Sequence, residues 1–335
     1  MNVTQNFSLK SLNTFGIDVK AHEFAIFTSP EELIELLSRS KKEKVMILGG
    51  GSNVLFTKDF PGIVLKNEIT GIDTVKEDEH HVYVKAGAGE NWHKFVMYCI
   101  ERNLAGVENL SLIPGNVGAS PMQNIGAYGV EIRDVFHDLE ALHLKTKKIV
   151  TFSNTDCEFG YRESVFKNKY KDEYVILNVT YRLNKHPEYH TSYGAVADEL
   201  ERINKGISIQ TISQAVINIR SSKLPDPSKI GNAGSFFKNP TLSADKFERL
   251  KRAHPGVPAY PQEDGKIKIA AGWLIEQCGW KGYRKGDAGC HERQALVLVN
   301  YSNAAGKEIY DLSEEIKKSV HKKFEVSLER EVNIV

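Results

Sequence analysis

The sequence lacks both a long hydrophobic run and an excess of either charge. In this chain of 335 residues, no apolar stretch approaches the roughly 20 residues that a helix needs to cross a bilayer. Its 44 lysines and arginines stand against 43 aspartates and glutamates, so no overall field favours nucleic acid or an anionic membrane. The first residues are polar and contain no apolar core typical of a secretion signal. We therefore expect a cytoplasmic protein that binds neither nucleic acid nor membrane.

Cysteine is also scarce, and its four copies follow no metal-binding pattern. They are Cys99, Cys157, Cys278 and Cys290, and no two of them form a C-x-x-C pair. Cys290 is followed by His291, but no second pair with ligand spacing accompanies these two residues. The sequence predicts free thiols, which a reducing compartment favours, and no metal site.

The N-terminal part has the pattern of a strand, a helix and a second strand. Residues 23–29 alternate as a strand does, and residues 29–32 form a capping box with proline at the first helical position. The helix carries three apolar residues on one face, namely Leu33, Ile34 and Leu37. Residues 44–48 predict a buried strand that leads into the motif GGGSN. This order is typical of the start of an α/β unit.

The middle of the chain predicts a helix and an antiparallel sheet. Residues 81–89 have the pattern of a strand with a glycine turn, and residues 91–106 repeat apolar side chains at helical spacing. A stretch rich in glycine, proline and asparagine follows, from residue 106 to residue 129. Several β-rich runs then lie between residues 135 and 183, which favours antiparallel strands.

The last part predicts mainly helices. A second capping box at residues 211–214 opens a helix with an apolar face made of Ile212, Ala215, Val216 and Ile219. Other expected elements are helices at 243–253, 270–278 and 306–324 and strands at 294–300 and 326–335. The fold class is therefore α+β, and the length favours two or three domains.

Two glycine-rich segments point to a ligand with phosphate groups. Gly49, Gly50, Gly51, Ser52 and Asn53 follow a predicted strand, and successive backbone N–H groups can form a nest for phosphate oxygens. A Rossmann site would need G-x-G-x-x-G opening a helix, and a P-loop would need its lysine. Because neither pattern is present, a tight turn without a ligand is the alternative.

The second segment, SLIPGNVGASPMQNIGAYGVEI, covers residues 111–132. Irregular loops of this length are usually functional or disordered, and its apolar content argues against disorder. Its glycines allow a ligand to approach the backbone closely, while Gln123 and Asn124 offer amide groups. Together the two segments predict a large cofactor that contains a polyphosphate.

At this point the motifs resemble a known family. IPGNVGASPMQNIGAYG is similar to the flavin loop of the p-cresol methylhydroxylase-like FAD-binding fold. With GGGSN, FGYRESVFK, RSSKLPDP, GNAGSFFKNP and EREV, the chain resembles type I UDP-N-acetylenolpyruvoylglucosamine reductases over nearly its whole length. YHTSYGAV resembles the tyrosine loop that this type carries over its substrate. The family makes UDP-N-acetylmuramate for peptidoglycan.

The resemblance implies a domain organisation and a cofactor. It implies FAD-binding subdomains at 1–67 and 68–208 and a substrate-binding domain at 209–325, with strand 326–335 returning to the active site. FAD would be held without a covalent bond, NADPH would be the reductant, and the enzyme would be a monomer. The implied flavin contacts are Gly49, Gly50, Gly51, Ser52, Asn53, Pro114, Gly115, Gly118, Ala119, Gln123, Asn124, Gly126 and Ala127.

Three residues match the family's catalytic positions. Ser235 is implied to protonate the carbanion-like carbon that hydride transfer from FAD N5 to the enolpyruvyl group leaves. Arg162 is implied to bind and polarise the substrate carboxylate through its guanidinium fork, and Glu331 to help stabilise the enolate. Lys223 and Lys238 are the cations nearest to Ser235 in sequence. Without the resemblance, these three residues would be interpreted as a turn-capping serine, a surface arginine and a solvent-facing glutamate.

The implied substrate contacts are Tyr193, Arg220, Lys223, Asn239 and Gln294. Lys223 follows a predicted helix, so a solvated helix end is its alternative interpretation. The chain also departs from the family motif beside Glu331. Where the family has a proline and an arginine, this sequence has Arg330 and Asn333.

Two other functions remain open from the sequence. A different flavin oxidoreductase, such as a hydroxy-acid or sugar oxidase, could use the same fold, but no histidine stands in a motif that would supply its base. A flavin or nucleotide-sugar sensor would need only binding residues. The joint presence of Arg162, Ser235 and Glu331 favours the reductase.

Overall fold

The computed structural model describes residues 2–40, 44–262 and 264–335. The chain forms two compact units, each built from several segments of the sequence. The first comprises residues 1–7, 21–50 and 61–222, and the second comprises residues 8–20, 51–60 and 223–335. The division into three domains stays a prediction, and the two units cut across it because residues 8–20 and 51–60 belong with the C-terminal part.

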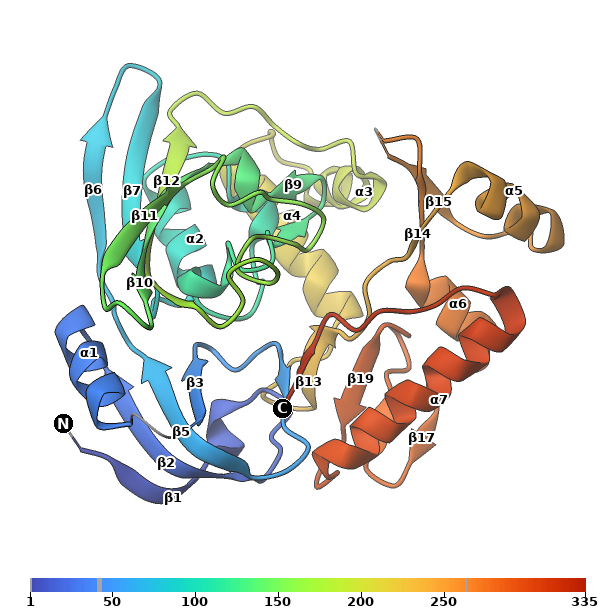
Figure 1. Cartoon of the computed structure of the whole chain (residues 1–335). Helices are drawn as coiled ribbons and strands as arrows, with labels where there is room; N and C mark the ends of the chain where they lie inside the picture. Colours follow the sequence, from blue (N-terminus) through green and yellow to red (C-terminus); the bar gives the residue numbers. More distant parts are fainter. Residues whose placement is uncertain (1, 41–43, 263) are drawn as a thin grey trace. The chain divides into compact units, whose positions relative to one another are not determined.

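A four-stranded sheet of the first unit contains the N-terminal strands (Figure 1). Its order is β1 (Thr4–Ser8), β2 (Lys20–Phe27), β5 (Phe60–Asn67) and β3 (Lys44–Leu48). Helix α1 (Pro30–Arg39) begins as predicted, because the Ser29 hydroxyl accepts a hydrogen bond from the Glu32 N–H. The expected burial of residues 44–48 was wrong, since β3 is an edge strand and only Leu48 is buried. An edge strand has a neighbour on one side only, so less of its surface is covered.

The second sheet of this unit is five-stranded and antiparallel, as predicted. Its order is β11 (Ile149–Ser153), β10 (Phe136–His143), β12 (Tyr174–Asn184), β7 (His81–Gly87) and β6 (Ile72–Glu77). Helix α2 (Trp92–Glu101) shares one buried cluster with β7, β10 and β12 (Figure 1). The helix ends at Glu101 rather than at Gly106. The predicted face of this helix is confirmed, because Trp92, Phe95, Val96 and Ile100 are all buried.

Two helices complete the first unit. Helix α4 (Ile209–Lys223) has the predicted buried face, but it begins earlier than the proposed capping box at 211–214. The Ser208 hydroxyl accepts from the Thr211 N–H, and the Thr211 hydroxyl accepts from the Ser208 N–H. Helix α3 (Gly194–Ile203) was missed, although Val196 and Leu200 have helical spacing and pack in the same cluster as α4.

The loop between α2 and β10 contains only short elements. They are the 3₁₀ turns η2 (Glu108–Leu110), η3 (Val117–Ala119) and η4 (Ile132–Asp134) and the strands β8 (Gly126–Ala127) and β9 (Val130–Glu131). The irregular segment that the sequence predicted here is therefore confirmed.

The second unit contains a four-stranded antiparallel sheet and a smaller sheet. The first has the order β13 (Gly231–Ser235), β19 (Val297–Asn300), β18 (Ala288–Cys290) and β17 (Arg284–Lys285). The second has the order β14 (Thr241–Leu242), β16 (Ile267–Ile269) and β15 (Ala259–Pro261). Helices α5 (Ala244–Ala253), α6 (Ala271–Gln277) and α7 (Gly306–Phe324) agree with the predicted ranges to within a residue, and a 3₁₀ turn, η1 (Lys10–Leu12), also belongs to this unit. Helix α7 packs on β18 and β19 (Figure 1).

The C-terminal segment pairs with a segment from the beginning of the chain. Strand β20 (Asn333–Ile334) runs parallel to β4 (Val54–Leu55). The regular strand is shorter than the predicted 326–335, but buried and exposed residues alternate over most of the segment, as they do in a strand. Val326, Leu328 and Val332 are buried, whereas Ile334 is exposed. Backbone pairing with β4 therefore fixes only the last residues, while side-chain burial anchors the segment before them.

The cysteines and the hydropathy of the helices bear on the broad class of protein. All four cysteines are free thiols, as the sequence predicted. The buried Cys290 donates a hydrogen bond from its sulfur to the Ala295 carbonyl, and burial raises its pKa to about 12. Among the described residues, no helix is long and apolar enough to cross a membrane.

Candidate active site

The two glycine-rich segments meet within the first unit. An added Cβ atom on Gly50 would lie 2.9 Å from the Gly115 Cα atom and 2.9 Å from the Asn116 side-chain oxygen. Asn116 in turn donates from its amide to the Gly89 carbonyl, which follows β7. Two backbones can approach this closely only where side chains are absent, so the glycines are needed for packing.

The same approach fits a bound FAD. Glycine-rich backbone without side chains allows a ligand to approach its N–H groups, and successive N–H groups can bind the diphosphate of a dinucleotide. Gly115 has a φ of +116°, a backbone conformation that other residues rarely adopt. The exposed Pro114 and Ala119 flank this contact. The glycines can therefore form tight turns and also bind a ligand, because these turns expose backbone that no side chain covers.

Arg162 lies against the flavin-loop segment. Its Nη2 atom donates to the Gly126 carbonyl at 2.5 Å, and Nη1 donates to the Asn124 carbonyl at 3.4 Å. The Glu131 carboxylate lies 4.0 Å from Nη1. The side chain is only 18% exposed, so the alternative of a solvated surface arginine does not hold. Arg162 of the motif GYRES therefore contacts the backbone of the motif NIGAYG.

Backbone strain gathers around this contact. Asn124, Tyr128 and Arg162 have positive φ angles of 44°, 49° and 55°, and Leu112 has one of 60°. A non-glycine residue in this region costs about 1–3 kcal/mol and persists only where the surroundings impose it. Such residues concentrate at functional sites, so this clustering supports the assignment of the loop.

The Asn124 amide is committed to the protein itself. Its nitrogen donates to Glu131 and to the Gly160 carbonyl, and its oxygen accepts from the Arg133 N–H. Both amide hydrogens are therefore used, and the side chain is fully buried. Its backbone carbonyl accepts from Arg162, and a contact of Asn124 with FAD stays a prediction. The side chain of Gln123 is half-buried, and its cofactor contact stays a prediction.

Tyr128, which sequence reasoning did not single out, joins two predicted substrate residues. The Tyr193 ring meets the Tyr128 ring edge to face at a centroid distance of 5.5 Å. Burial raises the pKa of Tyr128 and lowers the pKa of Arg220. The charge of Arg220 also acts on Tyr128 and favours its ionised form. The motif AYG inside the flavin loop was the available signal, because it places an aromatic hydroxyl among glycines.

His93 was also missed, and it supports the same group. Its Nδ1 atom accepts from the Leu112 N–H at 3.1 Å, and the Leu112 carbonyl accepts from Arg220 Nε at 3.3 Å. Burial, aided by the charge of Arg220, lowers the pKa of His93. A neutral imidazole is required here, because a protonated Nδ1 could not accept.

The second unit brings together Ser235 and Glu331, which are far apart in the sequence. Ser235 ends β13, and the carbonyl of the next residue, Phe236, accepts from the Glu331 N–H at 2.9 Å. The Glu331 carbonyl accepts from the Asn53 amide at 3.3 Å. Phe236 and Phe237 are fully buried, which anchors the chain immediately after the serine. Two predicted catalytic residues and the GGGSN motif thus share one neighbourhood.

The two lysines near Ser235 in sequence behave differently. Lys238 is buried, and its ammonium pairs with Glu329 at 2.6 Å. Lys223 is the last residue of α4 and is exposed. The structure therefore gives the buried cation a carboxylate partner, while the contact of the exposed Lys223 with a phosphate stays a prediction.

Asn239 and Gln294 both lie near the start of α6. The Asn239 side-chain oxygen accepts from the Ala271 N–H at 3.0 Å. An added Cβ on Gly272 would lie 3.2 Å from the Gln294 side-chain oxygen. The structure thus brings these two predicted substrate contacts together within the second unit. The side-chain oxygen of Asn239 also has a structural role, since it satisfies a backbone donor of the helix.

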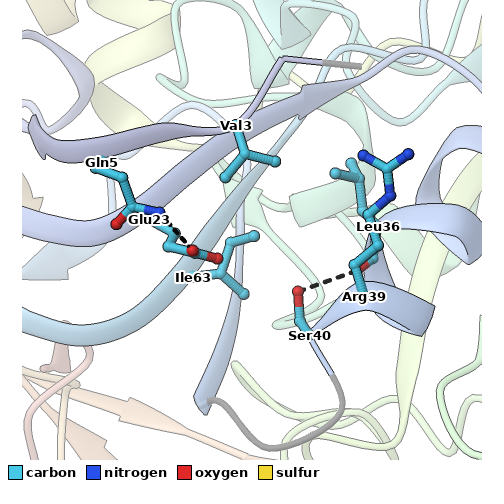
Figure 2. Close-up of a pocket in the computed structure, with 7 residues that line it drawn as sticks. All are labelled: Val3, Gln5, Glu23, Leu36, Arg39, Ser40 and Ile63. Atoms are coloured by element: carbon cyan, nitrogen blue, oxygen red, sulfur yellow. Dashed lines mark hydrogen bonds between the residues drawn. The ribbon is translucent and has the colours of Figure 1, made fainter.

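A separate small pocket lies in the first unit and contains none of these residues (Figure 2). Its volume is about 250 Å³, and Val3, Leu36 and Ile63 form its apolar part. Two of its lining residues form a hydrogen bond, drawn in Figure 2, in which Gln5 donates to the Glu23 carboxylate. Its two charged lining residues pair with other side chains, Glu23 with Gln5 and Arg39 with Glu35, and no predicted site residue lines the pocket.

Comparison with known proteins agrees with this geometry. Residues 22–153 match the FAD binding domain family, and residues 226–335 match the family described as UDP-N-acetylenolpyruvoylglucosamine reductase, C-terminal domain. A crystal structure of UDP-N-acetylenolpyruvylglucosamine reductase from Thermus caldophilus superposes with a TM-score of 0.69 at 24% identity, covering 99% of this chain and 98% of that one. The fold and the domain match thus define an FAD-binding protein with the α+β fold of the p-cresol methylhydroxylase type.

Sequence relatives define the family more narrowly. The UDP-N-acetylenolpyruvoylglucosamine reductase of Flavobacterium johnsoniae is 49% identical over the full length of both chains. The enzyme of the same name from Pseudomonas syringae pv. syringae is 50% identical over 100% of this chain and 99% of its own. The chain belongs to the UDP-N-acetylenolpyruvoylglucosamine reductase family.

Proposed function

We propose that this protein reduces UDP-N-acetylglucosamine enolpyruvate to UDP-N-acetylmuramate, with NADPH as the reductant and non-covalently bound FAD as the cofactor. The observation that carries the proposal is the hydrogen bond from the Glu331 N–H to the carbonyl beside Ser235. It joins the two ends of the C-terminal family match, and the residues at both ends are those expected to act on the substrate. The hydrogen bond places the Glu331 backbone beside the residue that follows Ser235, so the two predicted catalytic side chains start from neighbouring backbone positions.

The reaction sets two tasks for the protein. FAD, when bound, supplies a hydride to the terminal carbon of the enolpyruvyl double bond. Negative charge then develops on the adjacent carbon and on the carboxylate, and this charge must be stabilised. A proton must finally reach that adjacent carbon.

Arg162 and Glu331 are assigned the first task. A guanidinium stays charged and can donate two parallel hydrogen bonds to a carboxylate. Its donors now rest on the carbonyls of Asn124 and Gly126, which hold the fork in place. We assign Glu331 to hydrogen-bond the enolic oxygen or carboxylate of the substrate.

Ser235 is assigned the second task. A serine hydroxyl is a weak acid, but a carbanion-like carbon is a very strong base, so the transfer is favourable. The backbone of Ser235 is fixed by two neighbouring features, the buried phenylalanines after it and the pairing of β13 with β19. We assign the binding of the UDP part to Tyr193, Arg220, Lys223, Asn239 and Gln294.

The test is anaerobic stopped-flow absorbance near the flavin band. NADPH is added first, and UDP-N-acetylglucosamine enolpyruvate second. We expect bleaching by NADPH and recovery of the absorbance with the UDP-sugar. Bleaching without recovery would leave a flavoenzyme with another substrate, such as a hydroxy acid or a sugar. A protein that shows no flavin absorbance even with added FAD would contradict the proposal altogether.

We also propose that the enzyme acts in the cytoplasm as a monomer. Its substrates are water-soluble nucleotides, and one chain supplies every residue assigned above. Light scattering combined with size-exclusion chromatography should give a mass close to the 37.6 kDa of one chain. A mass of two chains would contradict the monomer.

A further inference from the structure

Arg330, next to Glu331, is fastened to helix α7 by three contacts. Its Nε atom donates to the Ser313 hydroxyl at 2.9 Å, and its Nη2 atom pairs with the Glu314 carboxylate. Its guanidinium carbon lies 4.5 Å from the centre of the Tyr310 ring. The side chain is 15% exposed, and the hydrogen bond from Arg330 holds the pKa of Glu314 below its usual range. A fork that uses two hydrogen bonds and an aromatic face has a single preferred position.

The residues after Glu331 are fastened to the GGGSN motif. The backbone N–H and the side-chain amide of Asn333 both donate to the Asn53 carbonyl, at 3.2 and 2.9 Å. The Asn53 amide donates back to the Glu331 carbonyl. Val332 between them is buried. The backbone of Glu331 is thus fixed on both sides and, through its own N–H, to Phe236.

Arg330 and Asn333 are the two positions where this chain departs from the reductase motif. Both departures supply side chains that tie the segment of Glu331 to other parts of the second unit. The Arg330–Glu314 ion pair should stabilise the segment more than the Asn333 amide does, because a partly buried charged pair contributes more than a hydrogen bond between neutral groups. The loss of such a tie would allow the segment to shift, and a displacement of about 1 Å can cost about 100-fold in rate.

We propose that Arg330 is a positioning residue for Glu331, holding its backbone in place through α7. The inference rests on the role that the proposed function gives to Glu331. Arg330 itself makes no contact with the substrate in this scheme. Its effect should therefore be confined to the step in which Glu331 acts, which is the oxidation of reduced enzyme by the UDP-sugar.

The test uses Arg330→Met, which keeps most of the side-chain stem and removes the fork. We expect it to slow flavin reoxidation by the UDP-sugar by about 10- to 100-fold. Flavin reduction by NADPH should stay within about twofold of the wild type, because Glu331 takes no part in it. Arg330→Lys keeps the charge but not the fork, so its rate of flavin reoxidation should lie between those of the wild type and Arg330→Met. It also serves as the working variant if Arg330→Met does not fold.

Lys307→Met is the matched control. Lys307 also forms an ion pair on α7, with Asp311 at 2.8 Å, but both side chains are at least half exposed and neither is tied to the C-terminal segment. Removing this pair should leave both half-reactions unchanged, because exposed pairs contribute little. If the control slows reoxidation as much as Arg330→Met does, general loosening of α7 explains the result and the proposal fails.

A double-mutant cycle with Glu331→Gln separates positioning from stability. If Arg330 acts through Glu331, Arg330→Met should add little further slowing once Glu331 has been replaced. An equal slowing in both backgrounds, or an equal loss in the two half-reactions, would show a structural role and overturn the proposal. If Glu331→Gln is slow and Arg330→Met is normal, this inference alone fails. If Glu331→Gln is itself normal, the assigned role of Glu331 fails, and the proposal with it.

Discussion

The surroundings of Arg162 in the first unit and those of Ser235 and Glu331 in the second are built in opposite ways. Around Arg162, most contacts come from one contiguous loop, residues 111–132, with four non-glycine residues in left-handed backbone in or against it. Around Ser235, three segments distant in sequence meet through backbone hydrogen bonds in extended conformation. The first region stores strain in one loop, and the second depends on pairing between segments.

This difference decides how each region should respond to change. A strained loop is held by its own packing, so a side chain can be altered while the backbone stays in place. Paired segments transmit a shift from one to the next, so a residue can matter without touching the substrate. The predictions below test this contrast, from the largest expected effect to the smallest.

Ser235→Ala should have the largest effect. General acid catalysis contributes about 100- to 10,000-fold, so reoxidation by the UDP-sugar should fall by that factor. Reduction by NADPH should continue, because the hydroxyl takes no part in it. Stopped-flow absorbance measures both rates. If both half-reactions survive, Ser235 is not the proton donor.

Arg162→Lys should come next. Lysine keeps the charge but loses the fork that holds the carbonyls and would hold a carboxylate. A hydrogen bond to a charged group is worth about 1.5–3 kcal/mol, so kcat/KM for the UDP-sugar should fall about 10- to 100-fold. Steady-state kinetics measures this effect. The control is Arg133→Lys, a half-exposed neighbour that also pairs with Glu131; an equal loss there would contradict the role of Arg162.

Glycine-to-alanine substitutions should cost more stability where the glycine is packed against other backbone than where it faces open space. Gly51 has a φ of +63°, and an added Cβ would lie 1.9 Å from the Leu12 carbonyl oxygen. Gly51→Ala should therefore lower the free energy of unfolding by about 2–5 kcal/mol. Gly129→Ala, at a φ of +86° with no atom within 4 Å, should lose only about 1–2 kcal/mol. Urea unfolding compares the two, and equal losses would mean that the close approach at Gly51 does not constrain the fold.

The dependence of stability on pH should be the smallest effect, and both units share it. Burial, with a nearby arginine, lowers the pKa of His93 in the first unit and of His291 in the second. The unfolded chain, in which histidine has a pKa of about 6.5, therefore binds more protons than the folded chain. Stability is full above that pH and declines as pH falls below it.

The measurement is Tm between pH 8 and pH 5 for the wild type, His93→Asn and His291→Asn. Asparagine keeps an acceptor in place of Nδ1 and does not titrate in this range. Each variant should lose less Tm than the wild type over the same interval. A wild type and variants with parallel curves would show that neither histidine is linked to folding.

The sequence supported the elements with strong local signals. Helix α1 begins at a serine followed by proline because that pair satisfies the helix N-terminus locally. The face of α4 was predictable from helical spacing, but its first residue was not, because Ser208 and Thr211 together form the cap. Strand β3 was misjudged because its apolar residues look the same at an edge as at the centre of a sheet.

By itself, the sequence determined the class of fold, the glycine-rich flavin segments and the motifs that carry Arg162, Ser235 and Glu331. These features depend on residue type and short spacing, which the chain displays directly. Only the tertiary structure decided that the Glu331 backbone lies beside Ser235 and Asn53, that the Tyr128 ring contacts the Tyr193 ring, and that Arg330 is bound to α7. Contacts between distant segments depend on how sheets and helices pack, and no local pattern encodes that pairing.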